Sequence, residues 1–195
     1  MITGFGRTGQ WFASQTMELE PDMMALAKGL TSGYVPMSAV MVGDRVANKL
    51  IADGGEFYHG FTYSGHPVAA AVALANLELI EREDMITRVR EDTGPYLAEA
   101  LAPLAEHRIV GEIRTFGMLA AIELLKSKDG LEMFEDTGAT GVICRDHAIN
   151  RGLMMRAVRD AMILSPALTY SRADIDETVR IAAQALDATA DQLGL

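Results

Sequence analysis

Glycines divide the first 66 residues into short segments, and their spacing leaves room mainly for strands and turns. Two apolar runs of strand length lie in this region, at residues 23–27 and 38–42. Short apolar runs bounded by turn residues are typical of buried strands, and glycine-rich connections between such strands often carry binding sites. We therefore predict an α/β arrangement with a site in its loops.

The pattern becomes helical at Pro67. Residues 67–82 are rich in alanine and other apolar side chains. Proline suits the first turn of a helix, because the N–H that it lacks would have no partner there. A second helix is predicted over residues 85–106, where apolar side chains recur at helical spacing.

The residues after position 105 combine strand and helix patterns. The predicted elements are strands over residues 109–114, 118–124, 153–158 and 161–164, and helices over residues 141–152 and from 171 onward. The last helix begins with Ser171-x-x-Asp174, which is close to a capping box. We predict an α/β part over residues 1–105 and a small α+β domain over residues 106–195.

Charge and cysteine content exclude several classes of protein. The net charge of −10, from 17 basic and 27 acidic residues, argues against nucleic acid and anionic membranes as partners. Cys144 is the only cysteine, so no intramolecular disulfide can form, which fits a reducing compartment. The chain begins without the features of a signal peptide, and its most apolar stretch is too short to span a bilayer. We expect a soluble, cytoplasmic protein.

Residues 4–9 match the dinucleotide-binding pattern G-x-G-x-x-G. That pattern binds pyrophosphate only between a strand and a long helix. Only three residues precede it here, and Pro21 follows too soon for a full helix. A tight glycine turn is the better interpretation.

Lys28 ends an apolar run and is followed by Gly29, whereas Lys49, Lys126 and Lys128 have polar neighbours. Lys28 is therefore either extended into solvent or buried with a depressed pKa, which would make its amine available for Schiff-base chemistry. Composition alone favours the exposed alternative, since most lysines lie on surfaces.

Four motifs, taken in order, resemble the signature region of class-III aminotransferases. They are Thr3-Gly4-Phe5-Gly6-Arg7-Thr8-Gly9, Pro21-Asp22, Ala27-Lys28-Gly29-Leu30 and Phe61-Thr62-Tyr63-Ser64-Gly65-His66-Pro67. The similarity extends over essentially the whole chain and is strongest to omega-aminotransferases that use amines such as putrescine with pyruvate. It implies fold type I: the C-terminal part of the large cofactor-binding domain, followed by the small domain.

The resemblance also implies a cofactor and its ligands. Lys28 would hold pyridoxal 5′-phosphate as a Schiff base and move the proton during transfer. Phe61 and Thr62 match positions that reach the cofactor phosphate of a neighbouring subunit, so the full-length protein would be a homodimer or homotetramer. Without the resemblance, Thr62 would read as an ordinary threonine at a strand edge. His59 and His66 are too few, and wrongly surrounded, for a metal site.

Arg156 lies in an otherwise apolar run, and a buried arginine needs a partner. In the resembling enzymes this arginine pairs with the carboxylate of the acceptor and withdraws for amines that lack one. The alternative is a structural salt bridge. Arg7 also matches a family position, where it either orients the neighbouring loop or contacts a ligand.

The chain departs from the family pattern in several places. Family members are about twice as long, and the aspartate that pairs with the pyridinium nitrogen would lie two residues before Met1. We therefore expect a truncated product or an internal start. Arg159 and Thr115 stand where the family has glycine, and Ala167 stands where it has proline. Losing a glycine where φ must be positive costs about 1 kcal/mol or more.

These features predict amino-group transfer from an amine to a 2-oxo acid through pyridoxal phosphate. Two alternatives stay open. One is a non-catalytic remnant that at most self-associates, with an apolar surface exposed where the missing half would pack. The other is a different reaction on the same scaffold, such as that of an aminomutase or a decarboxylase.

Overall fold

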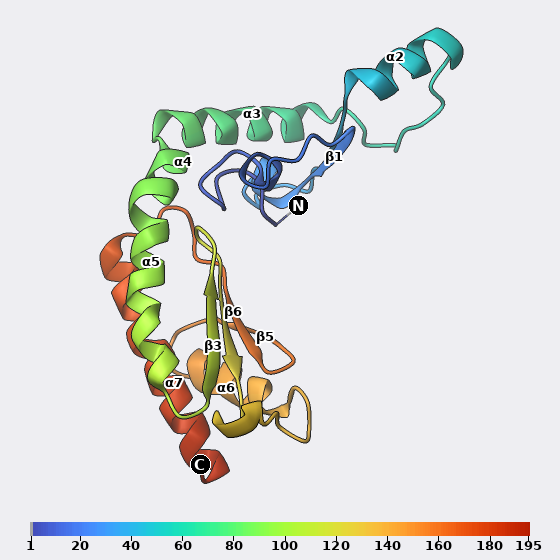
Figure 1. The fold of residues 1–195 in the computed structure, drawn as a ribbon. Helices are drawn as coiled ribbons and strands as arrows, with labels where there is room; N and C mark the ends of the chain where they lie inside the picture. The colour runs from blue at the N-terminus through green and yellow to red at the C-terminus, as the bar shows by residue number, and fades with distance from the viewer. Residues whose placement is uncertain (1) are drawn as a thin grey trace. The chain divides into compact units, whose positions relative to one another are not determined.

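The computed structural model describes residues 2–195, which form two compact units divided between Thr87 and Arg88 (Figure 1). The sequence placed the boundary near residue 105. The boundary comes earlier because Val89, Leu97 and Leu101 are buried in the same core as the C-terminal strands and helices. That the first unit is part of a cofactor-binding domain stays a prediction.

The first unit contains a two-stranded antiparallel sheet. Strand β1 (Met23–Leu26) pairs with β2 (Ala39–Val42), and both lie where the apolar runs predicted them. Helices α1 (Ala13–Thr16), α2 (Asp44–Asp53) and α3 (Pro67–Arg82) lie in this unit. Helix α2 was not predicted, because the glycines that bound it, Gly43 and Gly54, read as turn signals.

The α3 helix forms over the predicted residues. Pro67 occupies its first turn, and the imidazole of His66 accepts the N–H of Ala69 at 3.4 Å, which satisfies one free donor of the helix end. Ala69, Ala73 and Ile80 are buried along one face.

The β1–β2 ribbon leaves apolar side chains exposed on both of its faces. Val40 is 62% exposed, and Met23 and Met41 are exposed to similar extents. Two strands alone are marginally stable in water, and uncovered apolar surface of this kind is typical of an interaction surface.

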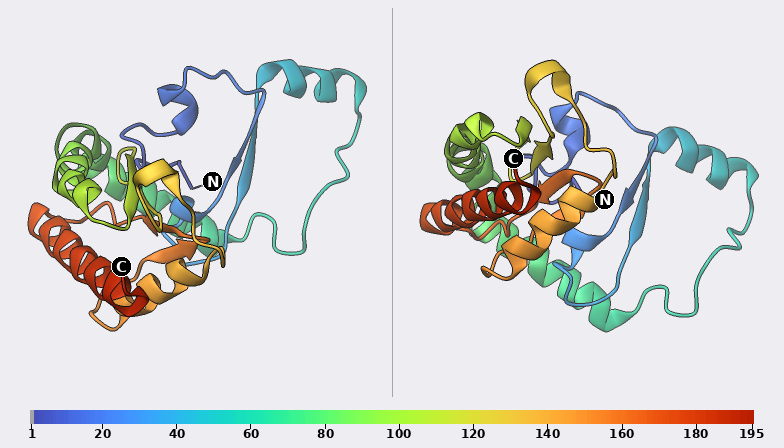
Figure 2. Two further views of the ribbon diagram at one scale, coloured as in Figure 1. Left: turned by 60° about the horizontal axis from the view of Figure 1, so that its bottom comes forward. Right: turned by 90° about the horizontal axis from the view of Figure 1, so that it is seen from below.

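The second unit is a four-stranded antiparallel sheet in the order β3-β4-β6-β5. Its strands are β3 (Val110–Thr115), β4 (Ala120–Leu124), β5 (Arg156–Val158) and β6 (Ala161–Leu164). Its main helices are α5 (Gly94–Leu101), α6 (Ala139–Ile149) and α7 (Arg172–Leu193). Helices α6 and α7 lie side by side (Figure 2). This layered arrangement confirms the predicted α+β character.

The core of the second unit lies on one face of this sheet. Ile122, Met162 and Leu124 are buried there against side chains of the helices. Register places Ile122 opposite both Ile113 and Met162, so these three side chains share the inner face.

The helix predicted over residues 85–106 is interrupted. It consists of α4 (Met85–Arg88), a π-helical segment (Val89–Thr93), α5 and a 3₁₀ turn (Ala102–Glu106). Pro95 has no N–H to bond the preceding turn, and its ring crowds the carbonyl four residues back. A wider π turn accommodates both effects.

The α7 helix begins with the predicted capping box. The hydroxyl of Ser171 accepts the N–H of Asp174 at 3.2 Å, and the Asp174 carboxylate accepts the N–H of Ser171 at 2.8 Å. The bonds from Ser171 lower the pKa of Asp174. No helix within residues 2–195 has the length and apolarity that a bilayer crossing requires.

Arg159, in the turn between β5 and β6, has φ of 54°. The family resemblance calls for glycine at this position. A non-glycine residue with this φ has a strained backbone, so Arg159 is unfavourable here. Thr115 is different: it pairs with Ala120 within β3 and has no positive φ.

Arg159→Gly is expected to raise the free energy of unfolding by about 1 kcal/mol, because glycine adopts this backbone without steric cost. Arg159→Ala removes the same side chain and keeps the strain, so it should leave stability nearly unchanged. Urea denaturation of the three proteins measures the difference. Equal stabilisation by both substitutions would show that the side chain, and not the backbone, is unfavourable.

Candidate functional site

Lys28 lies at the point where the chain leaves β1. It is the first residue of a 3₁₀ turn (Lys28–Leu30) and has φ of 55°, in the left-handed region. Its side chain is exposed, and its ammonium makes no hydrogen bond or ion pair within residues 2–195. Of the two alternatives from the sequence, burial is therefore wrong for this chain. The turn reverses the direction of the apolar run and presents the lysine to solvent.

The turn after Lys28 is fixed from several sides. A Cβ on Gly29 would lie 2.9 Å from the ring of Phe5, so only glycine fits there. Leu30 is buried, and the buried Thr31 donates its hydroxyl to the carbonyl of Val35 at 2.7 Å. The Asn76 amide donates to the carbonyls of Gly29 and Leu30 at 2.8 and 3.2 Å. The exposed amine thus stands on a well-anchored backbone.

The glycine motif at residues 4–9 is a tight turn, as predicted. Gly6 and Gly9 have positive φ, and the N–H of Phe5 donates to the carbonyl of Trp11 at 2.6 Å. Only the four-residue helix α1 follows it. The motif supplies Phe5, which packs on Gly29, and so supports the turn that carries Lys28.

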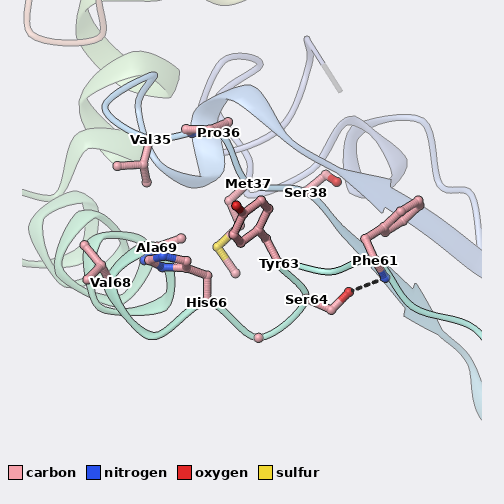
Figure 3. Close-up of a pocket in the computed structure, with 11 residues that line it drawn as sticks. Val35, Pro36, Met37, Ser38, Phe61, Tyr63, Ser64, His66, Val68 and Ala69 are labelled. Atoms are coloured by element: carbon pink, nitrogen blue, oxygen red, sulfur yellow. Dashed lines mark hydrogen bonds between the residues drawn. The ribbon is translucent and has the colours of Figure 1, made fainter.

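A cavity of about 730 Å³ lies beside the loop that precedes α3 (Figure 3). Its lining consists of residues 35–38 and 63–66 together with Phe61, Val68 and Ala69. Met37, Tyr63 and His66 lie near its centre, and Phe61 lies at one end. Lys28 and Thr62 are not among its lining residues.

The loop at residues 61–66 is closed by two hydrogen bonds between the same residues. The N–H of Phe61 donates to the hydroxyl oxygen of Ser64, and the N–H of Ser64 donates to the carbonyl of Phe61, both at 2.9 Å. The ring of His59 lies 5.5 Å from that of Phe61. Phe61 is 76% exposed, and Thr62 is also exposed. The loop therefore presents an aromatic ring and a hydroxyl to solvent.

Arg156 is exposed, so the expectation that it is buried is wrong. Residues alternate in β5: Met155 is buried and Ala157 half-buried, while Met154, Arg156 and Val158 point outward. The side chain lies on the outer face of the sheet. The alternative considered for Arg156, a structural salt bridge, is absent, because the guanidinium has no ion-pair partner within residues 2–195.

A second arginine lies on the same outer face. Arg156 pairs with Ile163 on β6, Ile163 pairs with Ala121 on β4, and Ala121 pairs with Arg114 on β3. Arg114 and Arg156 therefore point to the same face. Arg114 is neutralised, since it pairs with Glu123 at 2.9 Å and also with Glu112. These bonds, with Glu123 first, raise the pKa of Arg114. Of these two arginines, Arg156 is the one without a carboxylate partner among residues 2–195.

Arg7, Cys144 and the metal-binding residue types are weaker candidates for a reactive or binding group. Arg7 is half-buried, and burial lowers its pKa. Burial raises the pKa of the Cys144 thiol to about 11, so it is protonated near neutral pH and is no nucleophile. Within residues 2–195, no three His, Cys, Asp or Glu side chains group closely enough to hold a metal ion.

Two structurally important residues were missed from the sequence. Asn76 interrupts the apolar stripe formed by Ala69, Ala73 and Ile80. A polar amide at this helical spacing could have indicated a buried hydrogen bond. Asp160 is buried and accepts the N–H groups of Gly138 and Gly141. No local pattern marks Asp160, because its partners lie about twenty residues away.

Comparison with known proteins identifies the family. Residues 1–186 match the aminotransferase class-III family. The putrescine–pyruvate aminotransferase of Pseudomonas aeruginosa is 52% identical over 190 residues, covering 97% of this chain and 41% of that protein. The diaminobutyrate–2-oxoglutarate transaminase of Halomonas elongata is 40% identical over 199 residues, covering 99% and 42%. The chain belongs to the class-III aminotransferase family.

Solved structures agree on the fold. The omega transaminase from Pseudomonas jessenii, in complex with PMP, superposes with a TM-score of 0.92 at 38% identity, over 98% of this chain and 43% of that one. The fold is therefore that of the pyridoxal-phosphate-dependent transaminases. The chain spans about two fifths of the length of the relatives that it matches.

Class-III aminotransferases use pyridoxal phosphate, and the chemistry of the available donors fits this group. Lys28 offers an exposed primary amine for its aldehyde. The loop at residues 61–66 offers hydroxyl groups for phosphate oxygens, because Ser64 already accepts a bond and can donate its own proton. These groups come from separate segments of the first unit.

Proposed function

We propose that this protein transfers an amino group from an amine donor to a 2-oxo acid, with Lys28 as the residue that holds pyridoxal phosphate. The observation that carries the proposal is the setting of Lys28: an exposed, unpaired amine on a left-handed backbone position that neighbouring side chains anchor. Strain of this kind persists where surrounding structure enforces it, and it is commonly found at functional sites.

The roles of the chain's own groups follow from their chemistry. The cofactor, when bound, supplies an electron sink for the carbanion of the substrate. Lys28 would hold the cofactor through its Nζ atom, and this amine, when free, would carry the proton from the substrate carbon to the cofactor. The anchored turn fixes the backbone from which the Lys28 side chain extends.

Phe61 and Thr62 are proposed to bind the cofactor phosphate of a second copy of the chain. The loop is exposed and carries hydroxyl groups. Tyr63 within it, and Phe57 and Tyr58 just before it, are each at least 71% exposed. Aromatic side chains with this exposure are typical of protein interfaces. A dimer would bury them and bring the hydroxyl of Thr62 to a neighbouring site.

Treatment with pyridoxal phosphate and borohydride tests the assignment. Reduction locks the cofactor onto whichever amine has condensed with it, and peptide mass spectrometry locates the modified residue. We expect modification of Lys28 at cofactor concentrations where Lys49, an exposed lysine of the same unit paired with Asp53, stays unmodified. Thr62→Val should require a higher cofactor concentration. Equal modification of Lys28 and Lys49 would contradict the proposal.

Arg156 is proposed to bind the carboxylate of the acceptor, which includes pyruvate by analogy with the Pseudomonas aeruginosa relative. Arg156→Leu is expected to weaken pyruvate binding on the order of tenfold, because a charge-assisted pair is lost. Arg114→Leu is the matched control: it removes a guanidinium from the same face that already has carboxylate partners. Titration with pyruvate, followed by NMR, compares the variants. Equal losses would show nonspecific charge attraction.

A non-catalytic, self-associating protein is the second candidate. The apolar side chains on both faces of the β1–β2 ribbon favour it. Such a protein would show no cofactor adduct on Lys28 and would form oligomers whose size does not depend on pyridoxal phosphate. Sedimentation with and without cofactor, alongside the borohydride experiment, separates the two candidates.

A further inference from the structure

The Asn76 side chain joins α3 to the turn that carries Lys28. Its Nδ2 atom donates to the carbonyl oxygen of Gly29 at 2.8 Å and to that of Leu30 at 3.2 Å. These carbonyls belong to the two residues that directly follow Lys28 in the 3₁₀ turn. Asn76 is half-buried, forty-six and forty-seven positions along the chain from its two partners.

The turn needs such an anchor because its own bonds are weak. Within it, the N–H groups of Leu30, Thr31 and Ser32 donate over 3.3, 3.3 and 3.4 Å. These distances lie beyond the usual range for N–H···O bonds. In addition, Lys28 and Ser32 both have positive φ, which non-glycine residues adopt at a cost. Contacts from outside the turn must therefore hold this conformation.

Asn76 differs from the other contacts of the turn. Phe5 packs against Gly29 and Thr31 bonds Val35, but both act through segments close to the turn or through apolar contact. Asn76 is placed by a 16-residue helix and directs a polar group at the backbone. Compared with an apolar side chain at this position of α3, the amide packs less favourably and gains these two hydrogen bonds. The two bonds therefore explain why an amide is present there.

We propose that Asn76 is a positioning residue for the cofactor-holding lysine. It fixes the carbonyls of Gly29 and Leu30 and thereby keeps the backbone of Lys28 in its left-handed conformation, which sets the point from which the side chain extends toward the cofactor aldehyde. In that condensation a C=N bond forms, one water leaves, and Nζ must be unprotonated. The inference rests on the proposed function of Lys28 and deepens it.

The test uses the whole 195-residue chain and compares Asn76→Leu with the parent protein. Leucine has a similar size and no donor. The rate of pyridoxal phosphate attachment at Lys28, trapped by borohydride and read by peptide mass spectrometry, should fall on the order of tenfold. Attachment at Lys49 in the same sample should not change. Asn76→Gln, which retains the amide, should recover part of the rate.

Hydrogen exchange on the protein without cofactor gives an independent measurement. The amides of Leu30, Thr31 and Ser32 should exchange faster in Asn76→Leu, while that of Ala70 in the first turn of α3 keeps its rate. Asn48→Leu, on the exposed face of α2, is the control and should change neither readout.

The outcomes separate this inference from the proposed function. If the parent protein attaches no cofactor at Lys28, the proposed function fails and the role of Asn76 fails with it. If the parent attaches cofactor and Asn76→Leu does so at the same rate, only the role of Asn76 is overturned. Faster exchange throughout α3 would mean general unfolding and would also overturn it.

Discussion

Lys28→Ala is expected to abolish the cofactor adduct on the first unit and any transaminase activity of the full protein. The substitution removes the amine that we propose condenses with the aldehyde and carries the proton afterwards. Its backbone should persist, because Asn76 and Thr31 hold the turn through main-chain carbonyls rather than through the lysine side chain. We therefore expect a complete loss of adduct and activity, with little change in the free energy of unfolding.

The matched variant is Lys49→Ala. Lys49 is an exposed lysine of the same unit, but it lies on α2 and pairs with Asp53. Absorbance of the bound cofactor and mass spectrometry after borohydride reduction should be unchanged in it. Lys28→Arg retains the charge and still lacks a condensing amine, so it should behave as alanine does. An adduct that survives in Lys28→Ala on another lysine would remove Lys28 from the role.

Gly141→Ala is expected to destabilise the second unit by on the order of 3–5 kcal/mol. A Cβ at this position would lie 2.0 Å from the carbonyl oxygen of Arg159 and 3.2 Å from the Cα of Asp160. Both are backbone atoms, so no side-chain rotation relieves the overlap. The shift would also pull the N–H of Gly141 from the buried Asp160 carboxylate, which it bonds at 3.0 Å.

Urea denaturation gives the free energy of unfolding for this comparison. Gly60→Ala is the control, because the nearest atom to its added Cβ is the Ser64 hydroxyl oxygen at 3.9 Å and its φ is not positive. It should change stability by less than about 0.5 kcal/mol. A small effect of Gly141→Ala would mean that α6 can move away from the β5–β6 turn at little cost.

Several elements were predictable from local sequence because their signals are short-range. The Pro67 start of α3, the Ser171 capping box of α7 and the apolar runs of β1 and β2 all depend on neighbouring residues, and each forms at the predicted position. The break in the helix over residues 85–106 was also encoded locally, by Pro95, but apolar spacing alone concealed it.

The sequence proposed candidate site residues but did not predict the surroundings of each side chain. Family motifs named Lys28, Phe61, Thr62 and Arg156 as candidates. Composition favoured exposure for Lys28, but no local pattern showed that Arg156 is exposed. In β5, every neighbour of Arg156 is apolar, so alternation along the strand could not be read. Only pairing with β6 decides which face each side chain takes.

By itself, then, the sequence determined the chain's family and most of its helices and strands, and it named Lys28 as the candidate for holding the cofactor. Tertiary structure alone decided that Asn76 bonds the turn at Lys28 and that Asp160 joins α6 to the β5–β6 turn. It also decided that Arg156, within residues 2–195, has no carboxylate partner where Arg114 has two. The physical reason is range: helix caps and turns are set by residues a few positions apart, whereas these contacts join segments whose meeting depends on how the whole core packs.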